Sequence, residues 1–316
     1  MKTSPKDIVI IPFDFMDDEL IKSTLDLLNE DTIKSKHTRE FWNWRFNQNP
    51  FGSCLGWYAK DLKNNKIAGV LLWWPWKYRF NNTDVIFYQA INGKTSADYR
   101  NIGIFYELNK IAIKYFKSKN ISLLGFPNSK SYSSYIKLKW TTLSLVHPFY
   151  LAISPIKTVL KLLRFASTKP IMTAEFSFDS IDFKPPIYND RILYTPWNKD
   201  IIEWRFFKHP VFNYRFFFVG NDIIIYKTKN RFRLYEAQVV LSTITDHKVI
   251  KVFIKYLKEE GVDFISYYGL NTKFNRFFNH KVFKYKLKKK LYFVISNSSY
   301  LEKSVFRIEL AELDSQ

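Results

Sequence analysis

The turn at residues 99–105, YRNIGIF, combines residue types that bind phosphate groups. Arg100 is followed three positions later by Gly103, one of only nine glycines in 316 residues, and an apolar run at helical spacing comes next. The first amide groups of a helix point outward without partners, and the helix dipole adds about half a positive charge there. A glycine lets a phosphate approach the backbone, and an arginine can bind it through two nitrogen atoms. The turn therefore predicts an anion site, and its residues are Arg100, Asn101, Ile102, Gly103, Ile104 and Phe105.

The sequence excludes two common phosphate-binding motifs at this turn. It lacks the glycine-lysine-serine/threonine ending of a P-loop and the three glycines of a dinucleotide-binding turn. A second group of polar and aromatic residues, NSKSYSSYIKLKW, follows a short predicted strand at 121–126. It supplies Asn128, Ser131, Tyr135, Lys137 and Trp140 within one segment.

Together these two stretches resemble the signatures of the GNAT superfamily of acyl-CoA N-acyltransferases. The family pattern Arg/Gln-x-x-Gly-x-Gly/Ala is matched by Arg100 and Gly103, and Phe105 replaces a small residue. The second pattern, Asn-x-x-Ala-x-x-x-Tyr-x-Lys-x-Gly-Phe, is matched by Asn128 and Tyr135, and Lys139 replaces the glycine. The stretches FPN and WRFNQNPFG are similar to a branch of the superfamily found with surface-polysaccharide biosynthesis.

The resemblance implies acetyl-CoA or another acyl-CoA as co-substrate, bound by the residues from Arg100 to Phe105 and by Asn128. An amine would attack the thioester carbonyl in the opening between strands 85–91 and 121–126, where backbone amides would stabilise the oxyanion. Tyr135 stands where the family has the general acid that protonates the departing thiolate, and Tyr132 is the alternative. The implied acceptor is a small-molecule amine, namely an amino sugar or a related nucleotide- or lipid-linked precursor.

No residue spacing selects the general base. Deprotonation of an ammonium requires a carboxylate, a histidine or a water chain, and the candidates are Glu40, Asp98, Glu107 and His147. The five histidines are scattered singly, without the spacing of metal ligands, and no nucleophile elbow is present. We therefore expect neither a metal ion nor a covalent intermediate.

The elements that must position these residues occur twice in the chain. EFWNWRFNQNP at 40–50 returns as DIIEWRFFKHP at 200–210, and each copy precedes an aromatic strand, a helix and a short strand. Both helices carry apolar residues at i, i+3, i+4 and i+7. These residues are Leu108, Ile111, Ala112 and Tyr115 in the first copy and Val249, Val252, Phe253 and Tyr256 in the second. We predict an α/β fold of the mixed-sheet α+β kind, with two tandem GNAT-like modules, each a mostly antiparallel mixed sheet flanked by helices.

The repeat suggests a division into two domains and a linker. Residues 1–153 form the predicted acyl-CoA-binding domain, and residues 191–316 form a degenerate copy. The copy has no Arg-x-x-Gly element before its helix at Asp246, so we expect it to shape the substrate site or support the fold. Because Trp44 and Arg45 recur in this copy, we assign them to folding.

The linker, residues 154–190, contains an amphipathic helix in SPIKTVLKLLRFAS. Its apolar residues are Ile156, Val159, Leu160 and Leu163, and its basic residues are Lys157, Lys161 and Arg164. A basic amphipathic helix can lie on an acidic membrane surface. The interpretation that we favour is a linker helix whose apolar face packs between the domains.

Composition limits the function classes further. A net charge of +20 favours anionic partners. The single Cys54 excludes a disulfide within the chain, and no signal-peptide core or membrane-spanning run occurs, which predicts a cytoplasmic protein. The sequence does not determine the oligomeric state.

Two other functions compete with the acyltransferase. One is an aminoacyl-tRNA-dependent peptidyltransferase of the paired-GNAT type, which fits the charge, although such enzymes do not generally need the Arg100–Gly103 element. The other is a non-catalytic protein that binds nucleic acid or another polyanion through KVFKYKLKKK at 281–290. A lysine-guarded edge strand explains that stretch more simply, so we do not expect a nucleic-acid partner.

Overall fold

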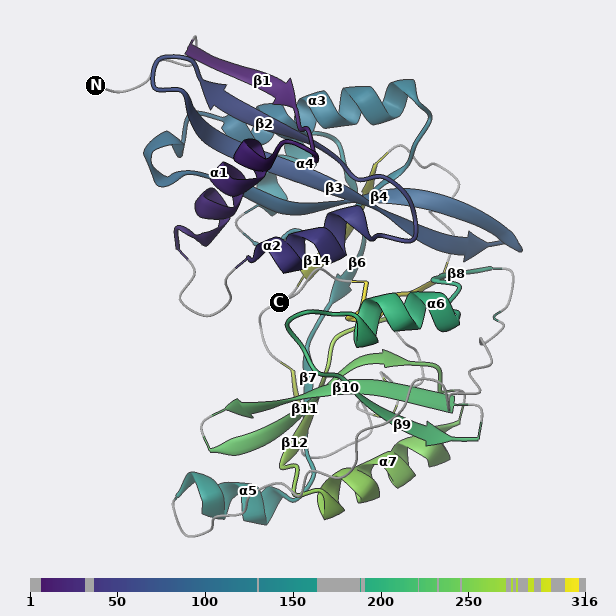
Figure 1. Cartoon of the computed structure of the whole chain (residues 1–316). Coiled ribbons are helices and arrows are strands. Elements are labelled where there is room, and N and C mark those ends of the chain that lie inside the picture. The colour runs from purple at the N-terminus through teal and green to yellow at the C-terminus, as the bar shows by residue number, and fades with distance from the viewer. Residues whose placement is uncertain are drawn as a thin grey trace. The chain divides into compact units, whose positions relative to one another are not determined.

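A computed structural model of the chain forms two compact units (Figure 1). Unit 1 comprises residues 1–145, 291–304 and 316, and unit 2 comprises residues 146–290 and 305–315. The structure describes residues 7–31, 37–129, 131–163, 188, 191–220, 222–231, 233–244, 246–270, 274, 277, 284–286, 291–296 and 305–312.

Unit 1 is built on a mixed sheet with the strand order β1-β2-β3-β4-β5-β14-β6. Its strands are β1 (Ile8–Pro12), β2 (Leu55–Asp61), β3 (Lys66–Phe80), β4 (Thr83–Thr95), β5 (Leu123–Gly125), β6 (Thr141–Val146) and β14 (Leu291–Ser296). The pairs from β1 to β4 are antiparallel, and β14 is antiparallel to β5. The β4–β5 pair is parallel and extends over only two residues of each strand, Tyr88 with Leu123 and Gln89 with Leu124.

Helices flank this sheet in unit 1. They are α1 (Asp18–Asn29), α2 (Arg39–Trp42), α3 (Ile104–Ser118) and α4 (Tyr132–Lys137), with a π-helix at Asn43–Asn47 and a 3-10 turn at Ala97–Tyr99. Asp17 caps α1 by accepting hydrogen bonds from the amides of Glu19 and Leu20. Helix α3 buries the i, i+4 series Ile104, Leu108, Ala112 and Phe116. Of the predicted residues, Leu108 and Ala112 are buried and Ile111 packs against the same core, whereas Tyr115 is 39% exposed and its neighbour Phe116 is buried.

Unit 2 is built on a second mixed sheet, with the order β13-β7-β12-β11-β10-β9. Its strands are β7 (Phe149–Ala152), β9 (Arg215–Val219), β10 (Asp222–Arg231), β11 (Leu234–Ser242), β12 (Phe264–Tyr267) and β13 (Lys284–Lys286), and β8 (Ile192–Tyr194) pairs in parallel with β15 (Val305–Arg307). Only β11 and β12 run parallel among the recorded pairs of the six-stranded sheet. The helices are α5 (Pro155–Leu162), α6 (Lys199–Ile202) and α7 (His247–Glu259), with a π-helix at Glu203–Phe207.

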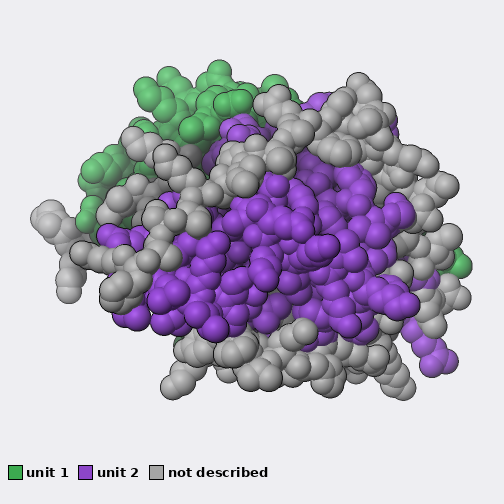
Figure 2. Space-filling model, turned by 90° about the horizontal axis from the view of Figure 1, so that it is seen from below, with its two compact units in different colours: residues 1–145, 291–304, 316 green, residues 146–290, 305–315 purple. Residues whose placement is uncertain are grey.

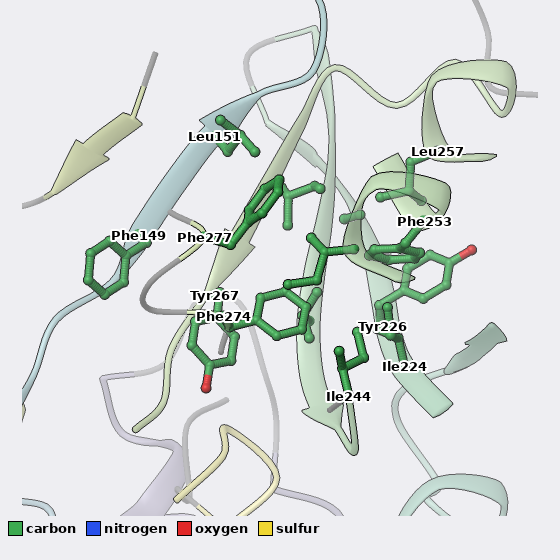
Figure 3. Close-up of a cluster of buried hydrophobic side chains, with 14 of the residues drawn as sticks. Phe149, Leu151, Ile224, Tyr226, Ile244, Phe253, Leu257, Tyr267, Phe274 and Phe277 are labelled. Atoms are coloured by element: carbon green, nitrogen blue, oxygen red, sulfur yellow. The ribbon is translucent and has the colours of Figure 1, made fainter. Parts of the chain in front are cut away.

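The core of unit 2 lies between α7 and one face of its sheet (Figure 3). Phe253 and Leu257 point from α7 toward the strands, where Phe253 contacts Tyr226 with ring centroids 5.4 Å apart. The predicted Val252 is 49% exposed, and Ile250 is buried in its place. The other predicted residues do face the core, since Phe253 is buried and Val249 and Tyr256 pack against it.

These two mixed sheets with flanking helices confirm the predicted fold class. The units differ from the predicted segments 1–153 and 191–316 because two strands pair away from their neighbours in sequence. Strand β7 pairs with β12 in the sheet of unit 2, and β14 pairs with β5 in the sheet of unit 1. The triplet Trp-Arg-Phe that recurs at 44–46 and 204–206, which we name the WRF motif, lies in both units in a π-helix that follows a short α-helix. That the two units are tandem copies stays a prediction.

The predicted linker helix is α5, and its apolar face does not pack inward. Ile156, Val159, Leu160 and Leu163 are all exposed, whereas Lys161 is buried. The predicted packing of this face is therefore wrong. The remaining linker, except Tyr188, and all of 281–290 except the edge strand β13 lie outside the described residues. No helix in the described part of the chain is long and apolar enough to cross a membrane.

Candidate functional site

An open pocket of about 480 Å³ lies over the N-terminus of α3 in unit 1. Its lining residues are Gly93, Thr95, Tyr99, Arg100, Asn101, Gly103, Ile104, Phe105, Tyr106, Asn128, Ser131 and Ser134. The structure thus brings together six of the predicted site residues from two separate stretches of sequence. Ile102 and Tyr135 are not among the lining residues.

The turn before α3 presents bare backbone to this pocket. Asn101 and Gly103 both have left-handed backbone angles, with φ of 69° and 87°. Gly103 is the N-cap of α3, and no side chain of the described residues caps this helix. The first amide to donate within the helix is that of Glu107, to the Gly103 carbonyl at 3.1 Å, so the amides before it have no acceptor in the helix. A Cβ on Gly103 would meet no protein atom within 4 Å.

Two cations gather at the edge of the pocket around one carboxylate. The guanidinium of Arg100 donates to Asp31 Oδ2 at 2.6 Å, and Lys94 Nζ lies 3.5 Å from the same oxygen. The hydrogen bond from Arg100 and the charge of Lys94 hold the pKa of Asp31 below its usual range. The Arg100 side chain is half exposed, so its remaining N–H groups are accessible to an anion.

Tyr99 fixes the loop that carries Arg100. Its hydroxyl donates to Asp61 Oδ2 at 2.8 Å, at the end of β2. Burial opposes ionisation of Asp61, but hydrogen bonds from Tyr99, Lys63 and Asn64 outweigh it and keep its pKa below the ordinary value. Burial and the Asp61 carboxylate raise the pKa of Tyr99, so this hydroxyl stays a donor.

A bulge in β4 shapes the floor of the pocket. The register against β3 shifts between Val70 and Leu72, and Asn92 on β4 has a φ of 47°. The buried Arg45 donates to Asn92 Oδ1 at 2.9 Å, which ties the WRF motif to the bulge. Gly93 follows, and a Cβ there would lie 2.8 Å from the ring of Phe105. The absence of a side chain at Gly93 on β4 therefore leaves room for the ring of Phe105 on α3.

The second predicted stretch lies beside this floor. Asn128 Oδ1 accepts from the Ser131 amide at 3.1 Å, at the start of α4. The Tyr135 ring lies behind the pocket, 4.9 Å from the Trp140 ring and 6.2 Å from that of Phe105. Burial raises the pKa of the Tyr135 hydroxyl above its ordinary value. The Tyr132 hydroxyl is hydrogen-bonded to Thr142 Oγ1 at 2.8 Å.

Comparison with known proteins gives matches at the level of structure. No family model and no curated protein matches the sequence. N-myristoyltransferase from Saccharomyces cerevisiae with bound myristoyl-CoA aligns with a TM-score of 0.55 and 12% identity, over 92% of this chain and 83% of that one. A GCN5-related N-acetyltransferase from Anabaena variabilis aligns with a TM-score of 0.61 and 9% identity, over 91% and 72%. The chain has the GNAT fold.

A third GNAT-fold match is a protein of unknown function from Enterococcus faecalis, described as a probable N-acyltransferase. It aligns with a TM-score of 0.59 and 9% identity, over 91% of this chain and 72% of that one. At these identities the matches establish the fold alone.

Helix α7 of unit 2 begins differently from α3. Asp246 caps α7 by accepting from the Lys248 amide at 2.9 Å. A carboxylate thus occupies the helix N-terminus where α3 has only Gly103. That the second copy does not bind a pyrophosphate stays a prediction.

The candidate bases lie outside the pocket lining of this GNAT fold. Glu40 and Asp98 are exposed, Glu107 is exposed and pairs with Lys110 at 3.6 Å, and His147 is half-buried. Among the described residues, no three His, Cys, Asp or Glu side chains gather to hold a metal ion. Sequence reasoning missed lining residues such as Gly93 and Tyr99, and the scarcity of glycine was the one signal that could have identified Gly93.

Proposed function

We propose that the chain is an acyl-CoA-dependent N-acyltransferase whose unit 1 binds the diphosphate of acyl-CoA at the turn before α3. The observation that carries this proposal is the open pocket over an uncapped helix N-terminus, lined by Arg100, Asn101, Gly103, Ile104 and Phe105. The GNAT fold supports it, because myristoyl-CoA is bound in one of the structures with this fold.

The turn has three properties that suit a diphosphate. The amides at the start of α3 are donors directed out of the helix, and the dipole of its fifteen residues favours negative charge there. Gly103 leaves space above the backbone. Arg100 can exchange the exposed Asp31 for a phosphate oxygen, since a surface ion pair contributes little.

The reaction joins an acceptor amine to the acyl carbonyl and releases the thiol. The thioester supplies the activated carbonyl. A base removes a proton from the amine, and the sulfur leaving group takes up a proton, so the charge balances. We propose Tyr135 as the donor of that proton. Its hydroxyl remains protonated because burial raises its pKa, and its ring lies 6.2 Å from that of Phe105, which lines the pocket.

The acceptor that we propose is an amino sugar or a related glycan precursor, acted on in the cytoplasm. The net charge of +20 supports an anionic acceptor, such as a nucleotide-linked one. We propose that unit 2 is a degenerate tandem copy that helps to shape the acceptor site, since Asp246 already caps its helix.

The test is release of free CoA thiol when acetyl-CoA is mixed with a panel of amino sugars. The natural chain should release thiol in an acceptor-dependent way, and Tyr135→Phe should lower kcat at least a hundredfold without changing KM for acetyl-CoA. Tyr132→Phe is the matched control and should retain most activity. Full activity in Tyr135→Phe would exclude Tyr135 as the proton donor, and no thiol release with any amine would contradict the proposed reaction.

A further inference from the structure

Helix α5 exposes the apolar side chains that an amphipathic helix normally buries. Exposed apolar residues on soluble proteins are usually scattered singly. Here five fall within one short helix and its end: Ile156 (80% exposed), Val159 (52%), Leu160 (40%), Leu162 (51%) and Leu163 (59%). They form a continuous apolar surface on unit 2, which we name the α5 surface.

A buried ion pair holds the helix in this orientation. Lys161 and Asp263 are each 2% exposed, and Lys161 Nζ lies 2.7 Å from Asp263 Oδ1. Asp263 also accepts from the amide of Tyr235 at 2.8 Å, and Lys161 Nζ lies 5.6 Å from the centroid of the Tyr235 ring. Separating a buried pair is costly, so Lys161 remains inward and the leucines beside it remain outward.

A row of lysines lies on the neighbouring helix. Lys248, Lys251, Lys255 and Lys258 occupy one exposed face of α7, and none of them forms an ion pair with another described residue. Figure 1 shows α5 and α7 at the same end of unit 2, and Figure 2 views unit 2 (purple) from that end. Asp263, which holds α5, follows the end of α7 by four residues.

We infer that the α5 surface and the α7 lysines bind unit 2 to the surface of an anionic lipid bilayer. Short apolar helices insert between lipid headgroups, and each nearby lysine strengthens attachment to an acidic membrane. A bilayer fits both features, because it offers an apolar layer directly beneath a negatively charged one. The chain as a whole, with 49 basic and 29 acidic residues, is also attracted to such a surface. The inference does not depend on the proposed acyl transfer.

The first test measures how much the apolar side chains of the α5 surface contribute to membrane binding. The full chain is floated with vesicles of phosphatidylcholine alone and of phosphatidylcholine mixed with phosphatidylserine. It should bind only the mixed vesicles, and Ile156→Asp combined with Val159→Asp should lower the partition coefficient more than tenfold. Met16→Asp combined with Leu62→Asp is the matched control, since both side chains are exposed in unit 1, and it should bind as the natural chain does.

The second test measures the charge contribution. Lys251→Gln combined with Lys255→Gln should weaken binding to the mixed vesicles about 25-fold, at roughly fivefold for each lysine. Lys114→Gln combined with Lys117→Gln on α3 makes the same change in net charge and should leave binding within about twofold.

A third test shows whether the α5 surface itself contacts the lipid. Cys54 is buried, so a cysteine introduced by Leu160→Cys can be labelled selectively with a polarity-sensitive dye. Its emission should shift to the blue on mixed vesicles, and the same dye at Leu62→Cys should not respond. Equal binding to both vesicle types, or wild-type binding by the Ile156→Asp/Val159→Asp chain, would overturn the inference. A dimer of the natural chain that these substitutions dissociate, with no vesicle binding, would assign the surface to a second copy instead.

Discussion

Gly103→Glu compared with Gly220→Glu separates ligand binding from backbone strain. Both glycines have a left-handed φ, 87° and 58°, and a Cβ at either position meets nothing within 4 Å. Each substitution should therefore cost about 1–2 kcal/mol of stability from backbone strain alone. At about 2–4 °C for each kcal/mol, both should lower the melting temperature by roughly 5 °C.

Only the Gly103 variant should lose affinity for CoA. Its carboxylate would enter the pocket where we place the diphosphate. Two unit charges 4 Å apart interact by about 1 kcal/mol in water and about 4 kcal/mol near a protein surface. The pocket is open, so an intermediate loss of about 2 kcal/mol is expected, or roughly thirtyfold in Kd.

The assay is calorimetric titration of CoA into the two variants and the natural chain, with thermal unfolding measured in parallel. Equal Kd values for the natural chain and Gly103→Glu would refute the placement of the diphosphate. Equal losses of CoA affinity in both variants would indicate that backbone strain, and not the position of the substituted glycine, determines binding.

Three further predictions rest on charged groups. Asp31→Asn should strengthen CoA binding about threefold at low salt by releasing Arg100, and a weaker affinity would mean that Asp31 positions this arginine. Lys161→Met leaves the buried Asp263 unpaired and should lower the melting temperature by about 10 °C, whereas no change would show that the pair is not formed. Burial, reinforced by neighbouring positive charges, lowers the pKa of Lys227 to about 7. Since the unfolded chain holds this proton up to about pH 10.4, stability should rise between pH 7 and 10, by up to about 1.4 kcal/mol per unit, and stay level below pH 7. Urea unfolding measured across this pH range tests the prediction, because the stability of Lys227→Met should not rise with pH. An equal rise of stability with pH in both chains would contradict the burial of a neutral amine.

Residue type and spacing predicted Arg100 and Gly103, and the resemblance to the GNAT patterns implied Asn128. All three line one pocket, and their binding of acyl-CoA stays a prediction. The helix of residues 104–118 followed from apolar periodicity, as did the burial of Leu108 and Ala112, but Phe116 is buried in place of the predicted Tyr115. Because residues at both i+3 and i+4 are apolar in this helix, the apolar stripe is too wide to show which of two adjacent residues faces the core.

Local sequence patterns could not predict contacts between residues that are far apart in the chain. The pairing of β14 with β5 joins residues about 170 positions apart. The bulge at Asn92 requires Arg45, 47 residues earlier, to hold it. Lys161 was assigned to a solvated face because lysine is rarely buried, and its partner Asp263 is 102 residues away.

The most direct test of the account is the titration of acetyl-CoA into the natural chain and Arg100→Ala. The natural chain should bind at a single site with micromolar affinity, and the substitution should weaken binding at least tenfold because a charge-assisted bond to phosphate is lost. A natural chain that binds no acetyl-CoA, or an Arg100→Ala chain that binds it equally well, would contradict the claim that this turn holds the co-substrate.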